Sequence, residues 1–83
     1  MYIHLGNEMV VNEKDIIGIF DLDTTTVSKH SRKFLEIAEK KNQVINVSYE
    51  LPKSFILTDN NGQKKVYISQ ISTTTLQKRS NIL

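Results

Sequence analysis

The stretch DIIGIFDL, residues 15–22, limits what this chain can fold into more than any other part of the sequence. In a β-strand successive side chains point to opposite faces, which places Ile16, Phe20 and Leu22 on one face. The two isoleucines between them fall on the other face, so both faces are apolar. A strand of this kind lies inside a sheet and under a covering layer. We therefore expect residues 15–22 to form the central strand of the fold.

Two short strand-like runs, residues 2–5 and 9–11, precede this stretch. They are joined by Gly6-Asn7-Glu8, in which glycine and asparagine tolerate the positive φ of a tight hairpin turn. We expect this hairpin to pair next with residues 15–22, which would make the opening of the chain an antiparallel meander.

A helix is predicted over residues 27–41. The polar cluster at 23–26 supplies side chains that accept hydrogen bonds from the exposed amides at a helix start. Within 27–41 the apolar residues gather on one arc at about 100° per residue, and the basic residues gather on the opposite arc. Asn42 can end this helix, because asparagine tolerates the left-handed conformation.

The remaining predicted strands are residues 43–49, 54–59 and 64–71. Pro52 separates the first two, because proline has no N–H to donate to a neighbouring strand. The sequence DNNG at 59–62 is the strongest turn signal in the chain, and it predicts a hairpin between the last two strands.

The run STTTLQKR at 72–79 begins with capping residues and predicts a short C-terminal helix. Together these elements predict an α+β fold: a small, mostly antiparallel sheet of about five or six strands, one central helix and the short C-terminal helix. Eighty-three residues are enough for one domain, residues 1–83. At this size oligomerisation is a natural way to gain stability.

Charge is distributed unevenly along the chain. Residues 1–27 carry a net charge of −4 and residues 28–83 a net charge of +6, within a total of +2. Such asymmetry favours an anionic partner, with nucleic acid the first candidate. The alternative is that the basic residues form a solvated face with no partner.

The sequence carries no motif of a catalytic or metal site. The absence of cysteine excludes disulfides, thiolate zinc sites and cysteine nucleophiles. His4 and His30 are too far apart for a ligand spacing, and three scattered glycines form no phosphate-binding loop. We therefore expect no enzyme activity, no metal and no cofactor.

No apolar run approaches the roughly 20 residues that a membrane helix needs. The first residues, MYIHLGNE, lack the basic start and long apolar middle of a signal peptide. We therefore expect a cytoplasmic protein that does not contact a membrane.

Binding through positive charge is the function that the remaining residues favour. Phosphate recognition needs lysine and arginine side chains that converge on one surface. A monomer with few such contacts binds weakly at physiological salt, whereas an oligomer that repeats the surface gains by avidity. We therefore expect nucleic acid as the partner and a homo-oligomer as the binding form. The candidate DNA-binding residues are Lys14, Lys29, Arg32, Lys33, Lys53, Lys78 and Arg79.

Four segments, MYIHLG, DIIGIFDL, PKSFILT and YISQISTTTLQKR, together resemble the RemA/RemB family of small bacterial regulators of extracellular-matrix genes. The resemblance covers essentially the full chain and is closest to the RemB branch. It implies a β-rich fold related to the LytTR DNA-binding type and ring-shaped homo-oligomers. It also implies binding to duplex DNA that affects the transcription of biofilm-matrix genes.

The sequence departs from the RemA branch at one loop. That branch has a DNA-contacting arginine pair where this chain has Glu50-Leu51-Pro52, followed by Lys53. Lys14 stands where the RemA branch has another functional arginine, and it keeps the charge without the bidentate fork. The departure leaves a second hypothesis open: an interaction module that assembles with itself or with a RemA-like partner without touching DNA.

Overall fold

The computed structural model describes residues 1–22 and 29–79 of the chain. Its strands are β1 (Tyr2–Gly6), β2 (Met9–Asn12), β3 (Ile16–Asp21), β4 (Val44–Asn46), β5 (Ser54–Asn60) and β6 (Gln63–Ser69). Its helices are the 3-10 turn η1 (Glu13–Asp15), α1 (Lys29–Lys40) and α2 (Thr73–Arg79). The predicted α+β class, with a central and a short C-terminal helix, is confirmed. Neither α1 nor α2 is long and apolar enough to cross a membrane.

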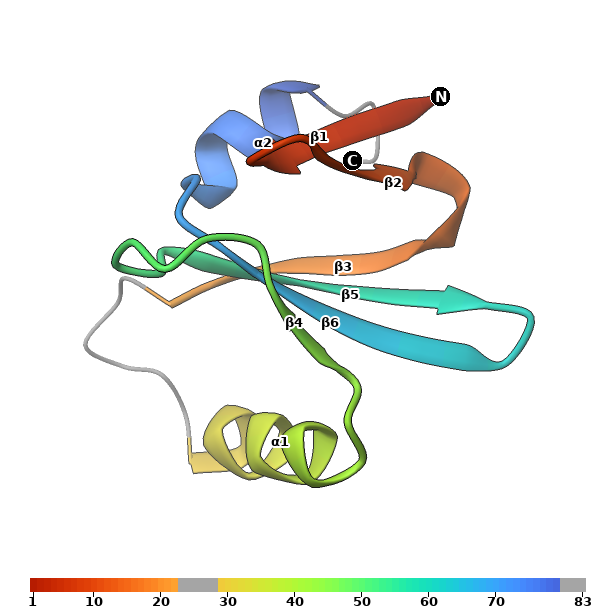
Figure 1. The fold of residues 1–83 in the computed structure, drawn as a ribbon, viewed down its shortest axis with the longest axis vertical. Helices are drawn as coiled ribbons and strands as arrows, with labels where there is room; N and C mark the ends of the chain where they lie inside the picture. Colours follow the sequence, from red (N-terminus) through yellow and green to blue (C-terminus); the bar gives the residue numbers. More distant parts are fainter. Residues whose placement is uncertain (23–28, 80–83) are drawn as a thin grey trace.

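The described elements form three layers (Figure 1). The middle layer is a four-stranded sheet in the order β3-β5-β6-β4, in which β4 runs parallel to β6 and the other pairs are antiparallel. The hairpin of β1 and β2 lies with α2 on one side of this sheet, and α1 lies on the other side. The sheet therefore separates the two helices.

Apolar side chains fill the space on each side of the sheet. On the α1 side, Ala38 packs with Phe55 and Val66. Under the hairpin and α2, Leu76 and Ile56 are completely buried. Burial of a side chain the size of Ile56 contributes about 1.5–3 kcal/mol. The buried residues on this side are Ile3, Leu5, Val11, Ile16, Val47, Ile56, Tyr67 and Leu76.

The hairpin of β5 and β6 forms as the DNNG sequence predicts. The Asp59 carboxylate accepts a hydrogen bond of 2.9 Å from the Gly62 amide. Asn61 and Gly62 adopt φ values of 53° and 87°, which asparagine and glycine tolerate. At the end of α1, Asn42 adopts a φ of 57°, as predicted for that position.

The prediction of a central strand at residues 15–22 is wrong. β3 is an edge strand, and Ile17 and Phe20 are 56% and 43% exposed. A bulge between Ile16 and Gly18 shifts the register, so Ile16 and Ile19 face the same core while Phe20 stacks on Phe55 on the other side. The strands buried on both faces are β5 and the second half of β6, and each of these strands has two paired neighbours.

The predicted meander is also wrong. Among the described residues, β2 pairs with β1 alone, and β3 pairs with β5. The reason is η1, which turns the chain after Asn12. The side chain of Asn12 accepts a hydrogen bond of 3.1 Å from the Lys14 amide and holds that turn.

Two further strand and helix boundaries differ from the predictions. The strand expected over 43–49 is only three residues long, and Tyr49 is fully exposed in the loop beyond it. The helix expected over 27–41 is observed as Lys29–Lys40. Its predicted start at residue 27 and the cap at residues 23–26 lie outside the described residues. The predicted cap of α2 is confirmed, since the Ser72 hydroxyl accepts a hydrogen bond from the Thr75 amide.

Candidate nucleic-acid interface

Strand β1 presents two polar aromatic side chains on the outside of the hairpin. Tyr2 and His4 are exposed, whereas Ile3 and Leu5 are buried against the sheet. This alternation follows from the two-residue period of a strand with one face on a core. The alternation of residues in YIHL therefore places Tyr2 and His4 on the outer face of the hairpin.

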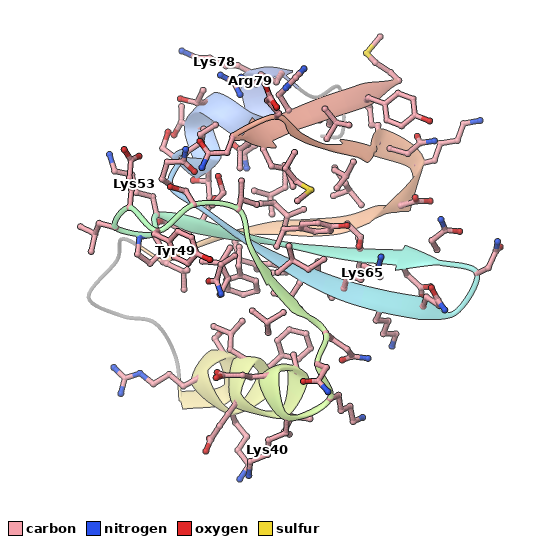
Figure 2. The ribbon with its side chains drawn as sticks, in the orientation of Figure 1. Lys40, Tyr49, Lys53, Lys65, Lys78 and Arg79 are labelled. Atoms are coloured by element: carbon pink, nitrogen blue, oxygen red, sulfur yellow. The ribbon has the colours of Figure 1, made fainter. Side chains whose placement is uncertain are left out.

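The hairpin and α2 are joined by hydrogen bonds to the β1 backbone. The Ser69 hydroxyl at the end of β6 donates a bond of 2.6 Å to the Leu5 carbonyl, and this contact is fully buried. Nη1 of Arg79 donates a bond of 3.0 Å to the His4 carbonyl. Arg79 is thereby held beside His4, at the same edge as Lys78 (Figure 2).

A groove of about 530 Å³ lies between β1, the following turn and α2. Tyr2, His4 and Arg79 contribute to its lining, together with the acidic side chain of Glu8. A guanidinium beside aromatic and imidazole rings suits a phosphate and an adjoining sugar or base. The negative charge of Glu8 repels an anion at its part of the groove. The part of the groove lined by Arg79 of α2 is therefore the more favourable place for a phosphate.

Lys14 lies at the other end of the same hairpin. The Glu13 amide donates a bond of 2.8 Å to the Met1 carbonyl, and Tyr2 pairs with Asn12 across the hairpin. These contacts fix η1 beside the start of β1, where Lys14 is exposed. Three of the predicted residues, Lys14, Lys78 and Arg79, therefore belong to the hairpin and α2 layer. We call this layer, with Tyr2 and His4, the outer layer.

The other predicted residues lie elsewhere. Arg32 and Lys33 are exposed on α1, across the sheet from the outer layer, and Lys29 is the first residue of that helix. Lys53 is exposed at one end of the sheet. Its amide donates to the Ser69 carbonyl at 2.9 Å and its carbonyl accepts from the Leu22 amide at 2.8 Å. The seven residues thus fall into three regions and do not converge on one surface.

The loop before Lys53 is apolar at its tip. Tyr49 is 102% exposed and Leu51 is 77% exposed. Figure 2 shows Tyr49 and Lys53 at the same end of the sheet, away from Lys65. Lys53 is therefore the residue of this loop that can offer a positive charge to a phosphate, and the acidic Glu50 lies three positions before it.

A small polar cavity of about 160 Å³ adjoins η1 at the opposite end of the sheet. Asp15, Lys65 and Tyr67 are among the residues that line it. Burial raises the pKa of the Tyr67 phenol above its ordinary value of 10.0, and the negative charge of Asp15 raises it further. Tyr67 is therefore a neutral hydrogen-bonding group near neutral pH, next to the turn that carries Lys14.

The sequence reasoning did not select Tyr2 and His4. The contact of Arg79 with His4 joins residues 75 positions apart, and no local pattern predicts it. The alternation in YIHL does indicate that both rings point outward. What it could not indicate is that a C-terminal helix would bring Arg79 to the backbone of His4.

Comparison with known proteins identifies a matching family and a similar protein. Residues 2–79 match a family described as RemA-like, Extracellular matrix regulatory protein A-like. The chain is also similar to the Extracellular matrix regulatory protein B of Bacillus subtilis (strain 168), with 37% identity over 83 residues. This similarity covers 100% of the present chain and 94% of the relative.

Proposed function

Since this chain belongs to the RemA-like family of extracellular matrix regulatory proteins, we propose that it regulates the transcription of matrix genes by binding duplex DNA as a homo-oligomer. In this proposal the protein is not an enzyme and requires no cofactor. A ring-shaped assembly and a LytTR-like mode of DNA binding are part of the proposal. The support comes from the family and from the charge placed on the outer layer.

The observation that carries the proposal is the grouping on the outer layer. Lys14, Lys78 and Arg79 belong to it, and Tyr2 and His4 add rings that can contact sugar or bases. Arg79 uses Nη1 to bind the His4 carbonyl, and its guanidinium has further N–H donors for a phosphate oxygen. Lys78 supplies a second cation from the last turn of α2.

Three cations per copy are too few for strong binding on their own. Each neutralised phosphate contributes through counterion release, and affinity falls with a slope of about 0.9 in log K per log salt for each contact. An assembly presents the outer layer once per copy, so it makes more phosphate contacts although the sequence of each copy is unchanged. The proposed function therefore depends on self-association.

The first test compares two charge reversals of equal size. In Lys14→Glu/Lys78→Glu the changed side chains are exposed on the outer layer, and in Arg32→Glu/Lys33→Glu they are exposed on α1. We expect the outer-layer variant to lose more than about tenfold in affinity for duplex DNA and the salt slope to fall by about 1 per lysine. Fluorescence anisotropy across a salt series measures both quantities.

The α1 variant is the control, because it makes the same change in net charge on the other side of the sheet. We expect its affinity to change far less than that of the outer-layer variant. If the α1 variant loses DNA and the outer-layer variant keeps it, the assignment of the surface is wrong. If the unmodified protein binds neither promoter nor random duplex at low salt, DNA binding itself is wrong.

The second candidate function is that of an interaction module that modulates a RemA-like partner without binding DNA. The exposed Tyr49 and Leu51 favour it, because they occupy the loop where an arginine pair would otherwise meet DNA. Co-purification of a mixed oligomer, together with regulation that survives both charge reversals, would select this function.

A further inference from the structure

One face of the hairpin of β5 and β6 changes from apolar to polar along its length. Ile56 and Tyr67 pair across the two strands and belong to the core under the outer layer. Side chains on one face of a strand recur at every second residue. The next two pairs on this face are Thr58 with Lys65 and Asn60 with Gln63. The polar half of this face lines the cavity of about 160 Å³ next to η1.

The other side of the cavity is formed by the end of β2 and by η1. Asn12 and Asp15 line it there, beside the apolar side chains of Val10 and Val11. The hydrogen bond of 3.1 Å from the Lys14 amide to the Asn12 side chain fixes the turn on which Asp15 lies. An engineered apolar cavity of roughly 150 Å³ holds a benzene molecule, so the cavity next to η1 has room for a ligand of similar size.

Polar groups that line this cavity have hydrogen-bonding capacity that the described residues do not use. The Tyr67 side chain is only 9% exposed, and within the described part of the chain its hydroxyl makes no hydrogen bond. Asp15 and Lys65 carry opposite charges, and these two described residues form no ion pair with each other. A buried hydroxyl without a partner is unfavourable unless water or a ligand supplies one. The cavity therefore offers an acceptor, a cation and a hydroxyl donor to a small polar molecule.

We propose that this cavity binds a small free amino acid in its zwitterionic form. The inference goes beyond the proposed function and does not rest on it. In this site the Asp15 carboxylate accepts hydrogen bonds from the ammonium group of the ligand, and Lys65 donates to the carboxylate of the ligand. Tyr67 adds a hydroxyl donor, because burial raises the pKa of its phenol and keeps the proton in place near neutral pH. Val10 and Val11 provide an apolar wall for a short side chain.

The two opposite charges favour a zwitterion over a simple ion. Lys65 attracts an anion that Asp15 repels, and the reverse holds for a cation. A zwitterion places each of its charges against the opposite one and brings no net charge into the cavity. Asp15 is half-buried whereas Lys65 is exposed, so water screens the contact with the ligand carboxylate more than the contact with the ligand ammonium. We therefore expect Asp15 to contribute more to affinity than Lys65.

Saturation-transfer difference NMR on the unmodified protein tests the site with three compounds of similar shape. L-alanine carries both charges, propionate lacks the ammonium group, and ethylamine lacks the carboxylate. We expect saturable binding of L-alanine with a Kd on the order of 1 mM, because so small a ligand makes few contacts. Propionate should bind about tenfold more weakly and ethylamine about threefold more weakly, since each has lost one of the two charged contacts.

Substitutions in the protein locate the bound L-alanine. Asp15→Asn should weaken binding about tenfold and Lys65→Gln about threefold. Tyr67→Phe should also weaken it, because this substitution removes the hydroxyl donor and keeps the ring. Lys64→Gln is the matched control: it removes the same charge from the neighbouring residue, which is exposed on the opposite face of β6. We expect Lys64→Gln to bind L-alanine as the unmodified protein does.

Equal binding of L-alanine and of either singly charged compound would show that the site takes a single charge, and it would overturn the proposal. Equal losses in Lys64→Gln and Lys65→Gln, or the absence of a saturable L-alanine signal, would overturn it as well. The three compounds are compared on the unmodified protein, so this comparison decides the question even where a variant does not fold. These titrations contain no DNA, so their outcome is independent of the proposed function.

Discussion

At the scale of single residues, the outer layer depends on a buried serine. Ser69 is fully buried, donates to the Leu5 carbonyl at 2.6 Å and accepts from the Ile71 amide at 3.0 Å. Its hydroxyl thus joins the sheet, the hairpin and the chain that leads into α2. The position of Arg79 beside His4 depends on that junction.

Ser69→Ala should lower the free energy of unfolding by about 1–3 kcal/mol, because it leaves a buried carbonyl and amide without partners. Urea denaturation followed by circular dichroism measures the change. Ser48→Ala is the control: its hydroxyl accepts one bond, from the exposed Glu50 amide, and we expect a change within about 0.5 kcal/mol. Equal effects of the two substitutions would show that the Ser69 contacts do not hold the layers together.

Tyr67 predicts a pH dependence of stability. Its pKa in the folded protein lies above 10.0, because burial and then the charge of Asp15 disfavour the phenolate. As pH rises past about 10, the unfolded chain loses this proton before the folded protein does, so unfolding becomes more favourable. The contribution is complete below pH 10 and is lost as pH rises toward the folded pKa.

The difference in unfolding free energy between the natural protein and Tyr67→Phe isolates this group, since other titrating groups are common to both. We expect the natural protein to lose stability relative to Tyr67→Phe as pH rises above about 10. Asp15→Asn should reduce the effect, because it removes the second cause of the shift. A stability difference that does not change with pH over this range would contradict the assignment.

At the scale of elements, α1 is attached to the sheet by few large side chains. Ala38, in the last turn of α1, is buried, and Phe34 stacks on Phe55 with ring centroids 6.4 Å apart. Phe34 and Ile37 stay partly exposed. The fit at Ala38 therefore determines how closely the helix approaches the sheet.

Ala38→Leu should destabilise the protein by about 1–3 kcal/mol, since the added methylenes have no space against Val66 and Phe55. Its affinity for DNA under folding conditions should stay within about twofold, because α1 lies across the sheet from the outer layer. Thermal unfolding and anisotropy, measured on the same sample, check both statements. A parallel loss of DNA affinity in the folded protein would place α1 in the binding surface.

The element scale also shows what the sequence could predict. The β5 and β6 hairpin follows from DNNG, and the cap of α2 follows from Ser72, because turn and cap chemistry act between neighbours in the chain. The edge position of β3 could not be predicted, because apolar residues on both faces are typical of central strands and the bulge at Ile17 leaves no composition signal. The candidate site was predicted only in part, because the meeting of Arg79 with His4 is set by tertiary packing.

At the scale of the whole molecule, one copy presents a weakly basic surface, and the proposed assembly repeats that surface. One copy offers Lys14, Lys78 and Arg79 on the outer layer, which corresponds to a salt slope of about −3 at most. The proposed self-association repeats the outer layer from copy to copy. The assembled protein should therefore neutralise more phosphates than any single copy can.

The slope of log K against log salt for duplex DNA, measured by fluorescence anisotropy on the assembled protein, tests this claim most directly. We expect a slope clearly steeper than about −3, which requires cations from more than one copy on the same duplex. A slope of −3 or shallower, or no binding at low salt, would contradict the claim that self-assembly creates the DNA-binding surface.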